Sequence, residues 1–241
     1  LCGTMIIRSR HGRRQEMDRR QQVPDAASVT VPDAPGGAGS AASESAAPAT
    51  RLRFRTGRLG RVRLLSHLEA ATAWIRALRR AGLPLAYSRG FHAHPKVTFA
   101  LASPVGEETE DDPMDVLLTE AVAPDAAREA LAAVLPAGFS VRSVRAVPLD
   151  VPSLMADLTA ITYTLMLPML PDEAAERMNL LLERDQLVVL RSVKHRAAPN
   201  GRAVVPVDLR LLITDLGPDP CTPDNWTAWR LRTCSREGRF A

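Results

Sequence analysis

The order of extended and helical segments between residues 51 and 147 restricts the folds open to this chain of 241 residues. Leu52 and Phe54 alternate with arginines, which is typical of a half-buried strand. Val62 and Leu64 continue the alternation after a turn that contains glycines. We therefore expect a bent strand or hairpin with one apolar face and one arginine face.

Helical segments separate the extended ones. Ser66-His-Leu-Glu69 forms a capping box, in which the Ser66 hydroxyl accepts from the Glu69 backbone N–H, and the helix that it starts ends near Gly82 and Pro84. The segments that follow are extended at 85–88, 96–100 and 114–119, helical at 124–135, and extended at 139–147. The order strand, helix, strand, strand, helix, strand is that of a ferredoxin-like (split βαβ) α+β sandwich.

Composition divides the chain into three parts. Residues 1–50 form an arm that starts basic and becomes rich in Ala, Gly, Ser and Pro, and we expect it to be disordered because it has too little apolar surface to offset the entropy of ordering. Residues 51–150 are the ferredoxin-like domain. Residues 151–241 hold a strand, a helix and further strands, at 161–167, 171–184, 187–193, 204–213 and 226–233. One more helix and strand would complete the same pattern, so we expect a second, similar α+β unit that is incomplete at its C-terminus.

Charge is segregated along the chain. Residues 51–106 hold ten arginines and one lysine against one acid, Glu69, whereas residues 107–125 hold eight acids and no base. Such a local excess indicates binding of phosphate or another polyanion. Only two of the 31 basic residues are lysine, and arginine favours RNA because it bonds phosphate through two N–H groups and stacks on bases. The alternatives are a GC-rich genome, a solvated face, or pairing with the acidic segment 107–115, which would neutralise the charge.

The predicted RNA contacts lie on the arginine strand and around one loop. Alternating arginines would place a positive stripe along the sheet, with a spacing comparable to that of phosphates. An aromatic side chain in the loop could stack on a base. The residues concerned are Arg53, Arg55, Arg61, Arg63, Arg89, Lys96 and Phe91.

Three histidines are candidates for chemistry. His92 and His94 lie two residues apart in Ser88-Arg-Gly-Phe-His-Ala-His-Pro-Lys96, so an extended backbone would point both to one face. His67 lies in the first turn of the capped helix, where backbone N–H groups attract anions. Together the imidazoles could bind a divalent metal such as zinc, act as acid and base on RNA, or only contact phosphate. The sequence assigns no metal site and leaves the catalytic residues open.

Several motifs occur in a family-specific order. They are Leu52-Arg-Phe-Arg, Leu65-Ser-His-Leu-Glu69, Gly90-Phe-His-Ala-His-Pro-Lys96 and Pro104-Val-Gly-Glu107. The chain resembles the radical SAM-associated domain of unknown function, which occurs alone or fused to the C-terminus of B12-binding radical SAM proteins. The resemblance implies a bacterial protein that works with a radical SAM enzyme, in RNA modification.

The cysteines exclude radical SAM chemistry by this chain alone. Cys2, Cys221 and Cys234 form no CxxxCxxC motif, no disulfide framework and no CxxC pair. We expect the chain to bind no cofactor, and the partner enzyme to use an iron–sulfur cluster and S-adenosylmethionine. The sequence also lacks a membrane-spanning apolar run and a signal peptide, which predicts a cytoplasmic protein with no membrane partner.

The resulting prediction is a non-catalytic module that binds RNA, either tRNA or rRNA, and presents it to a radical SAM enzyme. Two alternatives stay open. One is a histidine-dependent RNA-processing enzyme that uses His67, His92 and His94. The other is a protein-interaction scaffold that docks through its acidic segment.

Overall fold

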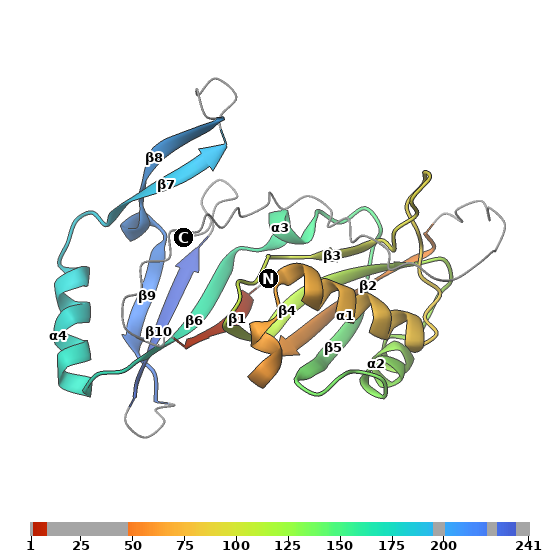
Figure 1. The fold of residues 1–241 in the computed structure, drawn as a ribbon, viewed down its shortest axis with the longest axis horizontal. Helices are drawn as coiled ribbons and strands as arrows, with labels where there is room; N and C mark the ends of the chain where they lie inside the picture. Colours follow the sequence, from red (N-terminus) through yellow and green to blue (C-terminus); the bar gives the residue numbers. More distant parts are fainter. Residues whose placement is uncertain (1, 9–47, 195–200, 221–225, 235–241) are drawn as a thin grey trace. The chain divides into compact units, whose positions relative to one another are not determined.

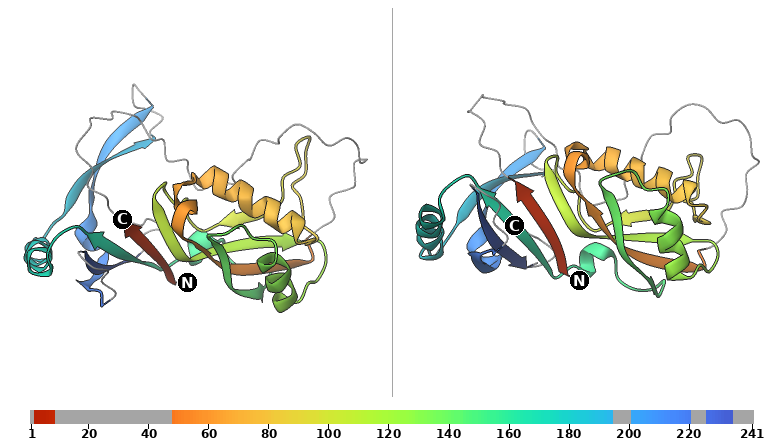
Figure 2. Two further views of the ribbon diagram at one scale, coloured as in Figure 1. Left: turned by 60° about the horizontal axis from the view of Figure 1, so that its bottom comes forward. Right: turned by 90° about the horizontal axis from the view of Figure 1, so that it is seen from below.

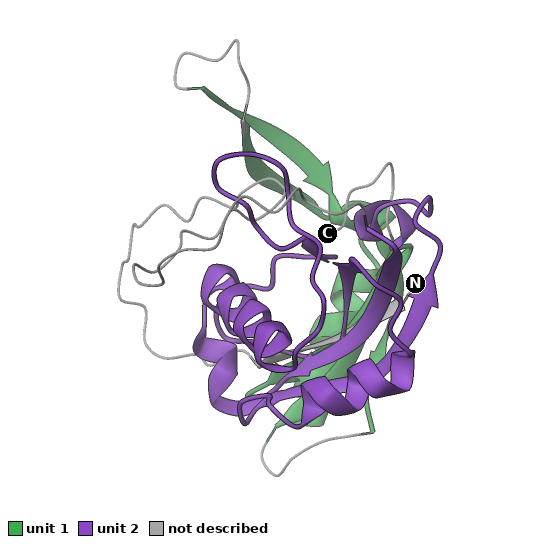
Figure 3. Ribbon diagram, turned by 90° about the vertical axis from the view of Figure 1, so that its right-hand side faces the viewer, with its two compact units in different colours: residues 1–2, 7–12, 159–241 green, residues 3–6, 13–158 purple. Residues whose placement is uncertain are grey.

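The computed structural model describes residues 2–8, 48–194, 201–220 and 226–234 (Figure 1). They form two compact units (Figure 3), which change at Leu158/Thr159 outside the N-terminal segment. Apart from residues 2–8, unit 2 holds the described residues up to Leu158, and unit 1 holds those from Thr159 onward. Strand β1 (Cys2–Arg8), whose residues are divided between the units, lies in the arm for which no ordered element was expected. The expected disorder of residues 9–47 lies outside the described residues.

Unit 2 is a ferredoxin-like sandwich. Its strands are β2 (Thr50–Arg58), β3 (Val97–Phe99), β4 (Glu107–Leu118) and β5 (Phe139–Val147). They pair antiparallel in the order β5-β2-β4-β3. Helix α1 (His67–Arg80) connects β2 to β3, and α2 (Pro124–Ala132) connects β4 to β5. The fold class that the sequence predicts is confirmed.

One core joins both helices of unit 2 to the same side of its sheet (Figure 2). Trp74 of α1 meets Phe139 of β5 edge to face, with ring centroids 5.1 Å apart. Leu52 and Phe54 of β2 are fully buried beneath the helices. Burying each large apolar side chain contributes roughly 1.5–3 kcal/mol, so this core accounts for much of the stability of the unit.

Helix α1 begins as the capping box predicts. The Ser66 hydroxyl accepts from the Glu69 backbone N–H at 3.3 Å, and the Glu69 carboxylate accepts from the Ser66 backbone N–H at 2.8 Å. The chain before it differs from the prediction, because residues 60–64 form a 3₁₀ helix, η1 (Gly60–Leu64), instead of a strand. Gly60 has a φ of 68°, which ends the extended run, and its N–H donates to Glu108 Oε1 at 2.9 Å.

Strand β4 begins at Glu107, whereas the apolar pattern predicts a strand only from residue 114. The acidic residues therefore belong to the sheet beside β2, where Asp115 lies opposite Arg53. A short helix, α3 (Leu154–Asp157), closes unit 2.

Unit 1 repeats part of the same pattern. Its elements are β6 (Ala160–Leu167), α4 (Pro171–Leu182), β7 (Val188–Lys194), β8 (Arg202–Asp208), η2 (Leu209–Leu211), β9 (Ile213–Pro218) and β10 (Thr227–Cys234). Strands β6, β10 and β9 pair antiparallel in that order, as the first, third and second strands of a ferredoxin-like sheet do. The β7–β8 hairpin forms a separate two-stranded sheet between α4 and β9.

The expected continuous strand at 204–213 is wrong, because η2 divides it into β8 and β9. Asp208 produces this interruption, since its carboxylate accepts from the backbone N–H groups of Leu187 and Arg210 at 2.8 and 3.0 Å. Such a side-chain contact to the backbone competes with strand pairing.

Candidate functional site

The outer face of the unit 2 sheet carries buried ion pairs. Arg53 is 2% exposed and lies opposite Asp115 of β4. Its Nε and Nη2 donate to the two carboxylate oxygens of Asp115 at 2.7 and 2.9 Å, and its Nη1 donates to Asp157 of α3. These hydrogen bonds raise the pKa of Arg53, Asp115 contributing most. The expectation that Arg53 contacts RNA is therefore wrong, because its guanidinium is enclosed and neutralised.

Two further arginines of the predicted stripe face acids. Arg55 Nε donates to Asp111 Oδ1 at 2.6 Å, and Arg63 Nη1 lies 3.4 Å from Glu108 Oε1. Arg61 is exposed, but it lies on η1 and not on a strand. The alternating stripe of phosphate contacts does not form. Pairing with the acidic segment, one of the alternatives that the sequence left open, accounts for Arg53, Arg55 and Arg63.

The histidine segment forms a loop that is closed at its base. Tyr87 and Pro95 form an isolated bridge. The Ser88 N–H donates to the His94 carbonyl at 2.8 Å, and the His94 N–H donates to the Ser88 hydroxyl at 3.0 Å. These contacts hold residues 89–93 together as an exposed tip.

The tip of the loop presents an aromatic ring beside positive charge. Phe91 is 98% exposed, and its ring meets that of His92 edge to face with centroids 5.1 Å apart. Arg89 and His92 are exposed as well, and Lys96 is half-buried at the loop base. An aromatic ring that is fully exposed beside cations is suited to stacking on a base.

Helix α1 adds basic residues that the sequence analysis did not select. Arg76 and Arg79 are exposed, and the Arg79 guanidinium lies 6.0 Å from the centre of the Tyr87 ring at the loop base. Among the residues that the structure describes, neither one forms an ion pair. The sequence signal for them was their position on the helix, on the side away from its apolar residues. We call Arg76, Arg79, Arg89, Phe91 and His92 the loop–helix surface.

The three histidines do not form one site. His67 is half-buried at the start of α1, edge to face with Phe99 at 5.4 Å, whereas His92 is exposed on the loop tip. In the described ranges, no group of three His, Cys, Asp or Glu side chains is placed to hold a metal ion. The alternative of a three-histidine metal centre is therefore wrong for His67, His92 and His94.

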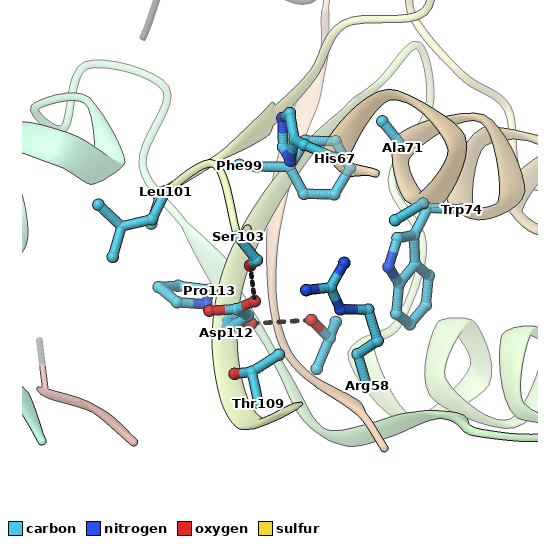
Figure 4. A pocket seen from close by; sticks show the side chains of 13 residues that line it. Arg58, His67, Ala71, Trp74, Phe99, Leu101, Ser103, Thr109, Asp112 and Pro113 are labelled. Carbon is cyan, nitrogen blue, oxygen red and sulfur yellow. Dashed lines mark hydrogen bonds between the residues drawn. The ribbon is translucent and has the colours of Figure 1, made fainter. Parts of the chain in front are cut away.

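His67 instead lines a pocket between α1 and the sheet (Figure 4). Arg58 of β2 points into this pocket, and Trp74, Phe99 and Asp112 form walls. Burial, and then the charge of Arg58, lowers the pKa of His67. The sequence analysis missed Arg58 and Asp112, because no local pattern distinguishes them from the exposed residues of the same charge.

The acids next to Arg58 are also perturbed. Burial raises the pKa of Asp112 despite hydrogen bonds from the Ser103 and Thr109 hydroxyls. Burial likewise raises the pKa of Glu107 to about 7. Perturbed groups around a cavity are a feature of functional sites. Acid–base chemistry at this pocket would involve His67 and Asp112 and would not involve His92 or His94.

Fold and site define a ferredoxin-like α+β domain with a projecting basic and aromatic loop, followed by a second α+β unit that shares part of its strand order. The chain belongs to the DUF2344 family, described as an uncharacterized protein conserved in bacteria, whose model matches residues 51–234. No curated protein matches the chain. Within the part of the chain that the structure describes, no helix has the length and apolar character needed to cross a bilayer.

Proposed function

We propose that this protein is an accessory module that binds single-stranded RNA through the loop–helix surface and presents it to a radical SAM enzyme. The observation that carries the proposal is Phe91, 98% exposed at the tip of a loop that also carries Arg89 and His92. Aromatic rings and arginines recognise unpaired RNA because unstacked bases offer their faces. Tyr87, beneath Arg79, connects the loop base to α1.

The first test measures RNA affinity of the Phe91→Ala variant by fluorescence anisotropy with a single-stranded RNA. We expect a loss of roughly 10-fold or more, the size of one lost base–aromatic stack. Folding stability should be unchanged, because the side chain is exposed. Leu170→Ala, which truncates a side chain that is 74% exposed in unit 1, is the control. Equal affinities for wild type and Phe91→Ala would contradict the proposal.

Salt dependence tests the electrostatic part. The affinity of wild type for RNA should fall steeply as the salt concentration rises. In the double variant Arg79→Gln/Arg89→Gln, the slope of log affinity against log salt should be smaller by roughly one to two units. The matched control is Arg177→Gln, on the surface of α4 beside Glu173. An RNA affinity of wild type that does not depend on salt would contradict binding at the loop–helix surface. Equal slopes for the double variant and for Arg177→Gln would contradict it as well.

The partner enzyme is the part of the proposal that rests on the family resemblance. The chain itself has no CxxxCxxC motif, so the cluster and S-adenosylmethionine would belong to the partner. Tagged protein should co-purify with a radical SAM enzyme from its own host. A radical SAM enzyme that modifies its RNA equally well after deletion of this gene would refute the accessory role.

A further inference from the structure

Arg58 is a buried cation whose charge is not neutralised by direct contact. It is 4% exposed, and within the described residues it forms no ion pair. Its Nη1 donates to the Leu65 carbonyl at 3.4 Å, and its Nη2 donates to the Pro104 and Glu107 carbonyls at 3.3 and 3.2 Å. These contacts are longer than the usual 2.9–3.0 Å of a strong N–H···O bond.

The Nε–H of Arg58 is buried and has no hydrogen-bond partner. A guanidinium group has five N–H donors, and the three long contacts above use only part of that capacity. Buried charged groups are normally paired and hydrogen-bonded, because removing them from water is costly. The Nε–H of Arg58 therefore lacks an acceptor, although Asp112 and Glu107 lie near enough for their charges to act on Arg58.

The cavity in front of Arg58 has the size of a small group. Its volume is about 20 Å³, enough for one water molecule or for the terminal atoms of a ligand. Figure 4 shows the Arg58 guanidinium directed into this space, with the His67 and Phe99 rings on one side and Asp112 on another. A water molecule would satisfy the Nε–H but would bring no negative charge into direct contact with Arg58.

We propose that this cavity binds the carboxylate of a small organic acid, with the Nε–H of Arg58 as a donor to its oxygen. A planar carboxylate matches the planar guanidinium, whereas a tetrahedral phosphate needs more room. The burial of Arg58 excludes an RNA backbone phosphate from this contact. This site is separate from the loop–helix surface and does not depend on the proposed RNA binding.

Asp112 must be neutral for an anion to enter. Its carboxyl group lines the cavity and accepts from the Ser103 hydroxyl at 3.2 Å. Because burial raises its pKa, Asp112 takes up a proton more easily than an exposed aspartate does, and a protonated carboxyl group can donate to a bound carboxylate. Binding of the ligand would therefore be accompanied by proton uptake.

Protonation of the other titratable groups near Arg58 also favours binding of an anion. His67 faces it from α1 and gains positive charge as pH falls. Glu107, with a pKa of about 7, loses negative charge as pH falls. Asp111, also on β4, is bonded to Arg55. Carboxylate affinity should thus increase as pH decreases, until the ligand itself becomes protonated.

The direct experiment follows the Arg58 Nε–H signal by ¹H–¹⁵N NMR during titration with sodium acetate, with sodium chloride at equal ionic strength as the control. We expect a saturable shift of this signal with millimolar acetate, and no shift with chloride. Shifts confined to the exposed arginine side chains, or a linear drift of all signals, would overturn the proposal.

A variant at Asp112 should bind acetate more tightly, a result that unfolding cannot mimic. Asp112→Asn removes the repelling charge, and we expect acetate to bind ~10-fold more tightly at neutral pH, with a weaker pH dependence. Asp125→Asn, at an exposed position of α2, should change neither. Unchanged or weaker acetate binding by Asp112→Asn would refute the proposed role of this cavity, whereas RNA affinity should be equal in both variants.

Discussion

Replacing Arg53 by methionine should destabilise the protein by about 3–5 kcal/mol, the usual cost of removing one partner of a buried ion pair. The substitution leaves Asp115 charged with only 7% of its side chain exposed, and it removes a bidentate contact across β2 and β4. Asp157 is 41% exposed, so water can solvate it after the change. The loss should arise mainly from Asp115.

Urea unfolding provides the measurement, read as a shift of the midpoint at a constant slope. The matched control is Arg142→Met on β5, where the arginine side chain is 56% exposed and its Nη1 lies 3.9 Å from Glu110 Oε2. That variant should lose less than about 1 kcal/mol, as for exposed pairs. The double variant Arg53→Met/Asp115→Leu should recover much of the loss, because no unpaired charge stays buried. Equal effects of Arg53→Met and Arg142→Met would refute the structural role of Arg53.

Replacing Glu107 by glutamine should make the protein more stable at alkaline pH and leave its stability unchanged at acidic pH. Oε2 of Glu107 is buried without a hydrogen-bond partner, and burial raises its pKa from 4.5 to about 7. The folded state therefore holds this proton more tightly than the unfolded state. Stability is greatest below pH 4.5 and is lost as pH rises through 7.

The difference between wild type and Glu107→Gln should be ~1–2 kcal/mol at pH 8, since one pKa unit corresponds to about 1.4 kcal/mol and the partial exposure of Glu107 to water reduces the effect. Chemical unfolding at pH 4, 6 and 8 measures it. Glu120→Gln, at an exposed position after β4, is the control and should follow wild type at every pH. A Glu107→Gln protein with the same pH dependence as wild type would show that Glu107 ionises freely in the folded state.

Local patterns predicted the elements of unit 2 because each depends on neighbouring residues. The capping box and Gly82 define the bounds of α1 within the chain itself, and alternation of apolar residues identifies β2 and β5. Tertiary packing selects the covered face of α1, since Leu68 is 49% exposed whereas Ala70 and Trp74 are buried. Which side of a helix is covered depends on the sheet beneath it.

The histidine loop was recognised from its composition, and its exposure agrees with a binding surface. The sequence could not separate His67 from His92 and His94, because the spacing along the chain does not show which side of the sheet each occupies. In the fold, His67 is half-buried at the start of α1 beside Phe99, whereas His92 is exposed on the loop tip and His94 lies at the loop base.

The segregation of charge could be read from the sequence, but its consequence required the tertiary structure. Ten arginines followed by eight acids indicate either an exposed polyanion surface or internal pairing, and both are consistent with the composition. The register of β2 against β4 decides for Arg53, which lies opposite Asp115, and the side-chain contact to Asp111 decides for Arg55. Burial then makes the pairing of Arg53 and the unpartnered Nε–H of Arg58 energetically important, because a charged group removed from water must find its partners nearby.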